Sequence, residues 1–380
     1  MRQALLTLLW LVLLSFPVVD GKSLAGDRPA SAVHDPVFDR ELSDALQQAL
    51  EEARLAQGSE SLSAGLYISE RCQWQGATGV TAQDASTAVD PDTLFAFGSI
   101  TKTFVAAVVL QLVEENRLAL HDRLGKWLKK HPRIDPNITV RQLLNHSSGL
   151  GGYMKNKIFR SAVLRDPDRI WSPKEVLTYI ASPSAAPGAG TLYTNTNYIL
   201  LGLIIEAVTG NPVERELEDR IFGPLRLEST FLRKGDVAPR RWANSKAPPR
   251  SVYSTVWIAG AVVSTPRDIA RWGHALFSGG VLKPASLQRV LKFEDRYLGQ
   301  FRVPMGLGVW DLSLGDTVAW GHGGRLRPFL ARMLYLPDLK LSVAYASSGG
   351  RGPGIPGQHL GRAFKAHRPD DMSMCFEAAD

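Results

Sequence analysis

A serine and a lysine, Ser99 and Lys102, stand at positions i and i+3 at the start of a segment with helical hydrophobic spacing. On a helix, side chains with this spacing lie on one face and within mutual reach. The first turn of a helix also presents unpaired N–H groups and the positive end of the helix dipole, which stabilise an alkoxide or an oxyanion. A serine hydroxyl becomes an effective nucleophile when a base takes its proton, and a neutral lysine amine can be that base. The pair therefore indicates nucleophilic chemistry on an acyl group.

The lysine can act in this way only if its amine is neutral near pH 7, so its pKa has to fall from about 10.4. Burial in apolar surroundings lowers a lysine pKa in this manner. Taken alone, the pattern is weak, because it occurs often by chance as a helix-capping serine followed by a surface lysine. Whether Ser99 and Lys102 are catalytic therefore depends on further residues.

Two more polar motifs follow along the chain. The first is Tyr193-Thr194-Asn195, and the second is Gly321-His322-Gly323-Gly324. Each has a structural alternative: Tyr193 as a packed aromatic, Asn195 as a helix cap and His322 as a surface residue at a strand end. Together and in this order, the motifs predict a single catalytic site.

This ordered set resembles the serine β-lactamase and penicillin-binding-protein superfamily, in particular the class C β-lactamase-like serine hydrolases. The similarity runs over about residues 40–365 and includes the stretches 91–95, 259–265 and 305–308. The group contains D-alanyl-D-alanine carboxypeptidases, D-aminopeptidases and S-x-x-K esterases. The resemblance implies a serine hydrolase that acts through an acyl-enzyme on amide or ester bonds, such as D-alanyl peptides or small esters. A weak β-lactamase, or a non-catalytic peptidoglycan- or penicillin-binding module on the same fold, are the alternatives.

The resemblance implies a role for each motif residue. Ser99 is expected to be the acylating nucleophile, and Lys102 its base or proton relay. Tyr193 matches a tyrosine that passes a proton to the leaving group, and Asn195 matches an asparagine that orients the lysine and the substrate amide. The residues leave open whether Lys102 or Tyr193 is the general base.

The third motif is expected on a strand that borders the site. His322 and Gly324 match its H-x-G form, and the oxyanion hole is expected to use the backbone N–H groups of Ser99 and of Arg325. β-Lactamases have a lysine in place of His322, so the histidine favours peptidases and esterases over efficient β-lactamases.

Two arginines follow the third motif where relatives carry small residues and glycine. Arg325 or Arg327 could pair with a substrate carboxylate, because a guanidinium suits bidentate contact. A solvated turn explains them equally well. His146, in the stretch 143–150, is expected to belong to a loop that packs beside the site.

The elements that must position these residues follow from hydrophobic periodicity and turn signals. Strands are expected near both ends of the chain, with mostly helical signals between them. We therefore predict an α+β fold of the β-lactamase/transpeptidase type: an antiparallel sheet built from both chain ends and flanked by helices, with a large all-helical region inserted at about 103–290. Helices are expected over 42–55, 99–116 and 361–366, and strands over 64–69, 73–79, 307–312, 317–321, 331–335 and 341–346.

The chain ends differ from this central domain, which we place at 37–366. Arg2 followed by the apolar run 4–19 predicts a signal peptide over 1–25, since the run is short for a membrane span. We also predict a linker over 26–36 and a polar C-terminal tail over 367–380. A secreted or periplasmic location follows, with membrane association only if the signal segment stays uncleaved.

Only two cysteines occur, Cys72 and Cys375. Their spacing fits no zinc pattern. A bridge between them is possible in an oxidising compartment, but Cys375 falls in the polar tail, so unpaired thiols are expected.

The composition is that of an ordinary globular protein, with 44% hydrophobic and 21% charged residues and a formal net charge of +7. The basic residues are spread along the chain and no nucleic-acid-binding motif occurs, so nucleic acid is not an expected partner. No metal-binding or nucleotide-binding motif is present, and we expect no metal and no cofactor. The expected partner is a small-molecule or peptide substrate, and the oligomeric state is left open.

Overall fold

The computed structural model describes residues 38–81, 87–189, 192–233, 242–243, 248–298, 300–352 and 354–368, together with residues 372 and 375. The signal peptide and linker predicted over 1–36 lie outside the described residues, as does most of the tail. Their boundaries stay predictions. Within the described part of the chain, no helix is both long and apolar enough to cross a bilayer.

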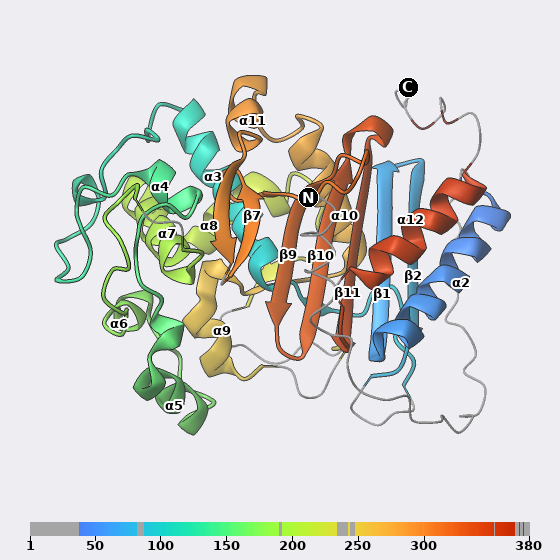
Figure 1. Ribbon diagram of the computed structural model, residues 1–380, viewed down its shortest axis with the longest axis horizontal. Coiled ribbons are helices and arrows are strands. Elements are labelled where there is room, and N and C mark those ends of the chain that lie inside the picture. Colours follow the sequence, from blue (N-terminus) through green and yellow to red (C-terminus); the bar gives the residue numbers. More distant parts are fainter. Residues whose placement is uncertain are drawn as a thin grey trace.

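The central element is an eight-stranded antiparallel sheet built from both ends of the chain, as predicted (Figure 1). An N-terminal hairpin joins it through β1, which pairs with the last strand, β11. The strand order is β2-β1-β11-β10-β9-β8-β7-β6. The strands are β1 (Ser59–Ser69), β2 (Cys72–Gly79), β6 (Glu294–Leu298), β7 (Phe301–Met305), β8 (Trp310–Asp311), β9 (Trp320–Leu326), β10 (Phe329–Leu336) and β11 (Leu341–Gly349).

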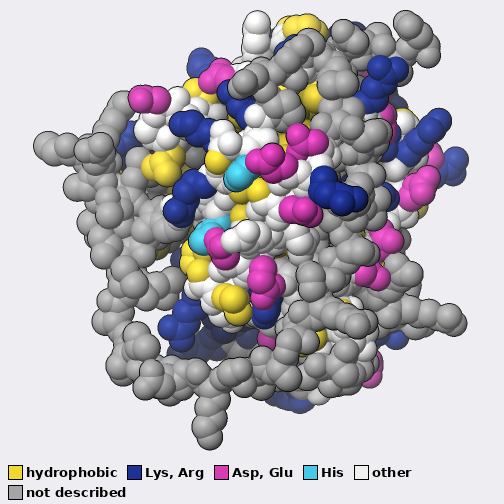
Figure 2. Space-filling model, turned by 90° about the vertical axis from the view of Figure 1, so that its right-hand side faces the viewer, with side chains coloured by type: hydrophobic (Ala, Val, Ile, Leu, Met, Phe, Trp, Pro, Cys, Tyr) yellow, Lys and Arg dark blue, Asp and Glu magenta, His cyan; other side chains and the backbone are white. Residues whose placement is uncertain are grey.

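Helices cover both faces of this sheet. The terminal helices α2 (Arg40–Gln57) and α12 (Ile355–His367) pack side by side on one face, where they enclose a small core (Figure 1). Viewed from that side of the molecule, acidic and basic side chains are intermingled (Figure 2). The other face packs on α10 (Pro266–Phe277) and on the large core of the helical region. Side chains of β10 alternate between the two cores, as the pleat of a strand requires: Phe329 and Met333 enter the large one and Leu334 the small one.

The inserted region is mainly helical, with one small three-stranded sheet of order β3-β5-β4. The central helix of this region, α3 (Thr101–Glu114), is apolar on almost every side, and it is therefore buried on all sides. The helices are α3 (Thr101–Glu114), α4 (Val140–Leu144), α5 (Lys157–Arg165), α6 (Pro173–Leu177), α7 (Asn195–Thr209), α8 (Val213–Leu217), α9 (Arg250–Val256), α10 and α11 (Pro284–Val290); the strands are β3 (Phe95–Ala96), β4 (Phe231–Leu232) and β5 (Val262–Ser264).

The hairpin β6–β7 was not predicted from the sequence. Its first strand carries charged residues, and the residue that points inward is Arg296 instead of an apolar one. This guanidinium donates to the carbonyl oxygen of Asn145 at 2.7 Å and pairs with Glu294. Because the inward-facing residue is an arginine, the strand lacks the alternation of apolar and polar residues that normally predicts a strand.

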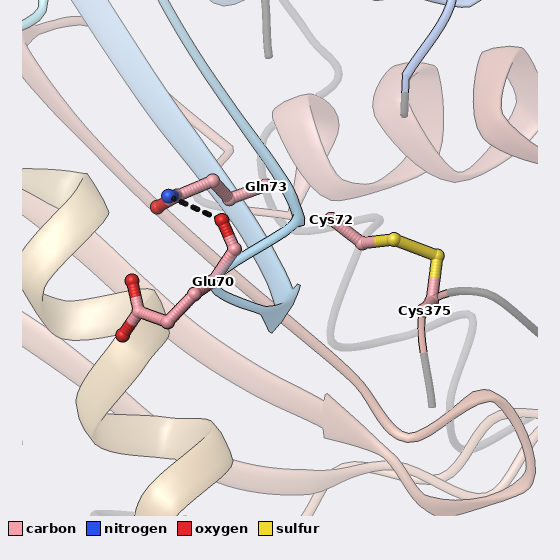
Figure 3. Close-up of a disulfide and its surroundings, with 4 residues drawn as sticks. All are labelled: Glu70, Cys72, Gln73 and Cys375. Carbon is pink, nitrogen blue, oxygen red and sulfur yellow. Dashed lines mark hydrogen bonds between the residues drawn. A yellow bond between two sulfur atoms is a disulfide. The ribbon is translucent and has the colours of Figure 1, made fainter. Parts of the chain in front are cut away.

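The expectation of unpaired thiols was wrong, because Cys72 and Cys375 form a disulfide (Figure 3). Cys72 begins β2, and the chain beyond α12 returns to it, with 5.5 Å between the two Cα atoms. Cys375 is almost fully buried in the small core, although its sequence surroundings are polar. The bond joins residues separated by 303 positions, a proximity that only the packing of the terminal helices creates.

Candidate active site

Ser99 and Lys102 meet at the start of the buried helix α3. Ser99 lies in a short 3₁₀ turn, Gly98–Ile100, that leads into α3, and it is partly exposed. Lys102 lies in the first turn of α3 and is completely buried, and its Nζ atom is 2.9 Å from Ser99 Oγ. The preceding Gly98 has a φ of 52°, and a Cβ atom there would lie 2.6 Å from the backbone nitrogen of Arg325. Both the conformation and the space require glycine next to the serine.

Lys102 Nζ also donates to two oxygen acceptors from distant segments. These are Asn195 Oδ1 at 2.8 Å and the carbonyl oxygen of Ala259 at 2.6 Å. Burial holds the pKa of Lys102 well below its ordinary value of 10.5. A neutral amine has two N–H groups and one lone pair. Since the two oxygens occupy the N–H groups, the lone pair is available to the third neighbour, the Ser99 hydroxyl.

The strained turn at Trp257 presents the Ala259 carbonyl. Trp257 has a φ of 38°, unusual for a bulky residue, and its carbonyl oxygen accepts the N–H groups of Gly260 and Ala261 at 3.1 and 2.8 Å. Its indole N–H donates to Glu214 Oε1 at 3.0 Å. The stretch 259–265 belongs to the family resemblance, but its side chains do not reveal that a main-chain oxygen accepts from Lys102.

The Tyr193-Thr194-Asn195 motif spans the start of α7: Tyr193 and Thr194 precede the helix, and Asn195 is its first residue. Thr194 caps this helix by accepting from the backbone N–H of Thr196, so the cap role considered for Asn195 belongs to its neighbour. The Tyr193 hydroxyl is buried next to the Ser99 hydroxyl and makes no hydrogen bond of normal geometry among the described residues. Burial raises its pKa, which the nearby Ser99 hydroxyl only partly opposes. Tyr193 is therefore protonated at neutral pH and able to donate.

His322 lies on β9 and is almost completely buried. Its Nδ1 atom is 2.6 Å from the carbonyl oxygen of Gly323, so this nitrogen carries the proton and donates. Burial, aided by the nearby Lys102, lowers the pKa of His322 to about 3. The third motif thus contributes a neutral imidazole.

The backbone of β9 lies directly against the turn that carries Ser99. A Cβ atom on Gly324 would lie 1.9 Å from the carbonyl oxygen of Phe97, so only glycine fits there. The backbone of Arg325 lies against Gly98, as the expected oxyanion hole requires. The register pairs Arg325 with Leu330 and His322 with Met333, so the arginine side chain leaves the opposite face of the strand and is exposed. Arg327, in the turn before β10, is exposed as well.

His146 lies beside the site, as expected, and it supports the tyrosine motif. Its ring lies 4.2 Å from the ring of Tyr193, between centroids. Its Nδ1 atom accepts from the backbone N–H of Thr194 at 3.3 Å and faces Asn197 Nδ2 at 3.0 Å. Burial, with Lys102 nearby, holds its pKa well below the ordinary value, so the ring is neutral.

A mixed helix and sheet fold with a Ser-x-x-Lys pair at the start of a buried helix defines the serine β-lactamase and transpeptidase class. The family model described as Beta-lactamase matches residues 46–366, and the chain belongs to this family.

Similar proteins of this family have several activities. A solved D-stereospecific amidohydrolase from Streptomyces sp. shares 31% identity with a TM-score of 0.70, over 84% of this chain and 98% of that one. A D-amino acid amidase from Ochrobactrum anthropi SV3, complexed with L-phenylalanine, shares 26% identity with a TM-score of 0.77, over 86% and 99%. The esterase EstB of Burkholderia gladioli is 33% identical over 209 residues, which are 50% of this chain and 48% of the esterase. The chain spans about half the length of most of the curated relatives it matches.

Proposed function

We propose that this protein is a serine hydrolase that cleaves amide or ester bonds through an acyl-enzyme on Ser99. One observation carries the proposal: the Lys102 amine lies 2.9 Å from the Ser99 hydroxyl, fully buried, with its other two neighbours both hydrogen-bond acceptors. This arrangement supports Lys102 as the general base, because Tyr193 keeps its proton at neutral pH.

In the acylation step, the Lys102 lone pair takes the Ser99 proton while Oγ forms a bond to the substrate carbonyl carbon. The carbonyl oxygen becomes an oxyanion that accepts from the backbone N–H groups of Ser99 and Arg325, and one such donor contributes about 3–4 kcal/mol. The bond to the leaving group then breaks, and the leaving atom takes the Tyr193 hydroxyl proton. The Lys102 ammonium returns a proton to Tyr193.

In the deacylation step, a water molecule loses a proton to the neutral Lys102 as its oxygen attacks the acyl carbon. The ester bond to Ser99 breaks, Oγ recovers the proton, and the carboxylic acid is released. Asn195 holds the lysine in place throughout, through its 2.8 Å contact.

Amide or ester substrates such as D-alanyl peptides and small esters fit this site better than β-lactams. A lysine at the third motif would supply a positive charge to a β-lactam carboxylate. The neutral His322, with a pKa of about 3, supplies none. Similarity to D-amino-acid amidohydrolases and to an esterase supports the same choice.

We also propose that the protein works in an oxidising compartment, secreted or periplasmic. The Cys72–Cys375 disulfide supports this location, since such bonds persist there and are rare in the cytosol. The apolar segment near the N-terminus agrees with export.

The test is active-site labelling with a fluorophosphonate, followed by peptide mapping by mass spectrometry. We expect one adduct, on Ser99. Ser99→Ala should abolish both labelling and turnover, whereas Ser161→Ala, at an exposed serine of α5, should change neither. Turnover of D-alanyl peptides, short-chain esters and nitrocefin would then define the substrate class. Unchanged hydrolysis by Ser99→Ala would refute the mechanism.

A further inference from the structure

Trp310 is the outermost of three rings that lead away from Ser99. It belongs to the short strand β8, which pairs with Met305 on one side and Gly321 on the other. Its ring packs against His322 with 4.0 Å between centroids and the two planes tilted by 33°, and it meets the Tyr193 ring edge-on at 6.0 Å. His322 is buried, whereas Trp310 is partly exposed.

Packing of the protein core does not explain this tryptophan. Among the described residues, Trp310 belongs to neither hydrophobic core, while Trp320, on the neighbouring strand, packs against the larger one. Trp320 has its own protein partners, Phe277 and Tyr335, at 6.0 and 6.2 Å. One of the two tryptophans therefore stabilises the fold, and the other presents an aromatic surface beside the site.

The rings that contact Trp310 are uncharged, and the Arg332 guanidinium lies near it across Gly323. Burial keeps His322 neutral and Tyr193 protonated, so the wall of three rings carries no charge at neutral pH. The main-chain oxygen of Tyr297, on β6, accepts the backbone N–H of Tyr193 at 3.2 Å, so this strand borders the tyrosine. Such a wall attracts planar apolar groups through ring stacking and burial.

Trp310 also lies at the point along β9 beyond which this strand no longer pairs with β8. In the described part of the chain, β8 pairs with β9 only at Gly321 and Trp320, so residues 322–326 pair with β10 alone. This free edge runs past the turn that carries Ser99. A substrate at Ser99 whose leaving group faces Tyr193 therefore places that leaving group toward the Trp310 ring.

We infer that Trp310 determines specificity and that the site prefers leaving groups carrying an aryl group, such as an aromatic amine or a benzylic alcohol, over small alkyl ones. This inference rests on the proposed function, because it takes Tyr193 as the proton donor to the leaving group. Trp310 would thus specify the chemical class of the leaving group, which the motif residues do not specify.

The experiment compares benzyl and ethyl esters of one acyl group, whose alcohols are similarly basic. For the unmodified protein, we expect kcat/KM to be about tenfold higher for the benzyl ester, the size that ring stacking and burial provide. Trp310→Leu should bring the ratio close to one, and Trp310→Phe should retain part of it. The matched variant Trp320→Leu should lower stability and leave the ratio unchanged. A ratio near one in the unmodified protein, or a ratio insensitive to Trp310→Leu, would overturn the inference.

A binding measurement separates this inference from the proposed function. N-benzylacetamide and N-ethylacetamide are titrated calorimetrically into Ser99→Ala, which needs no turnover. We expect the benzyl compound to bind about tenfold more tightly, and the difference to disappear when Trp310→Leu is added. If Ser99 takes no fluorophosphonate label but this binding difference holds, the proposed function fails and the aryl subsite stands. Equal binding of the two amides overturns the subsite even in an active hydrolase.

Discussion

The amine of Lys102 donates to the main-chain oxygen of Ala259 at 2.6 Å, across a sequence separation of 157 residues. This contact and the one to Asn195 use the two N–H groups of a neutral amine and direct its lone pair at Ser99. A main-chain oxygen is a suitable partner for this purpose, because it cannot be protonated and adds no charge that would raise the lysine pKa.

The neutral Lys102 predicts the pH dependence of acylation. Because burial lowers its pKa well below 10.5, the amine is a free base at neutral pH, and acid protonates it as the pH falls through the lowered value. We expect kcat/KM to rise with pH to a plateau reached far below pH 10. Lys102→Met should reduce kcat/KM by about 10²–10⁴-fold or more. Lys126→Met, at an exposed lysine, is the control. A rising limb centred near pH 10 would contradict this role.

Tyr193 and Tyr198 provide a matched pair of hydroxyl deletions. The Tyr193 hydroxyl makes no hydrogen bond of normal geometry among the described residues, whereas that of Tyr198 donates to the Leu144 carbonyl at 3.1 Å. Tyr193→Phe should slow amide hydrolysis by about 10²-fold or more and spare p-nitrophenyl esters, whose leaving group needs no proton. Tyr198→Phe should lower the free energy of unfolding by about 1 kcal/mol. It should not change the rate of amide hydrolysis relative to that of p-nitrophenyl ester hydrolysis. Kinetics on both substrates and urea unfolding test the two variants. Equal slowing of amide and p-nitrophenyl ester by Tyr193→Phe would remove its role as proton donor.

Arg325 tests whether the exposed end of β9 recognises a carboxylate. Its backbone borders Gly98, so the side chain can be removed without deleting the expected oxyanion donor. Because its side chain leaves β9 on the face opposite His322, Arg325→Ala should leave kcat/KM unchanged within about twofold, both for a D-alanyl peptide with a free C-terminal carboxylate and for the methyl ester of the same peptide. Arg327→Ala, two residues further along, is the comparison. A loss of about tenfold or more that is confined to the free carboxylate would contradict this and show that Arg325 pairs with the substrate.

The disulfide should stabilise the fold without contributing to the site. Cys72 and Cys375 lie in the small core under α2 and α12, whereas Ser99 and Lys102 lie at the large core on the other side of the sheet. Replacing both cysteines by serine should lower the free energy of unfolding by about 2–4 kcal/mol and leave kcat/KM at 25 °C unchanged. Urea unfolding with and without a reductant measures the loss, and the double variant should not respond to the reductant. Free thiols in the unreduced protein would show that the bond does not form.

The local parts of the structure were predictable from the sequence. Ser99 and Lys102 share a helix face because i and i+3 residues of any helix do so, and the continuous apolar run after them requires a buried helix. Short runs bounded by turn signals indicated β1, β2, β10 and β11, and their position at both chain ends predicted a sheet that unites them. The β6–β7 hairpin escaped prediction because a buried, charge-paired Arg296 occupies its inner face.

What the sequence by itself determined is therefore the set of reactive groups and the local geometry of the first pair. Only the tertiary structure decided what those groups can do. It brings Asn195 and Ala259 to Lys102 from 93 and 157 residues away, and it excludes the water that would keep the amine charged. It likewise closes the disulfide and packs Trp310 against His322. Protonation state and substrate preference depend on the neighbours of a side chain in space, and the linear pattern does not specify those neighbours.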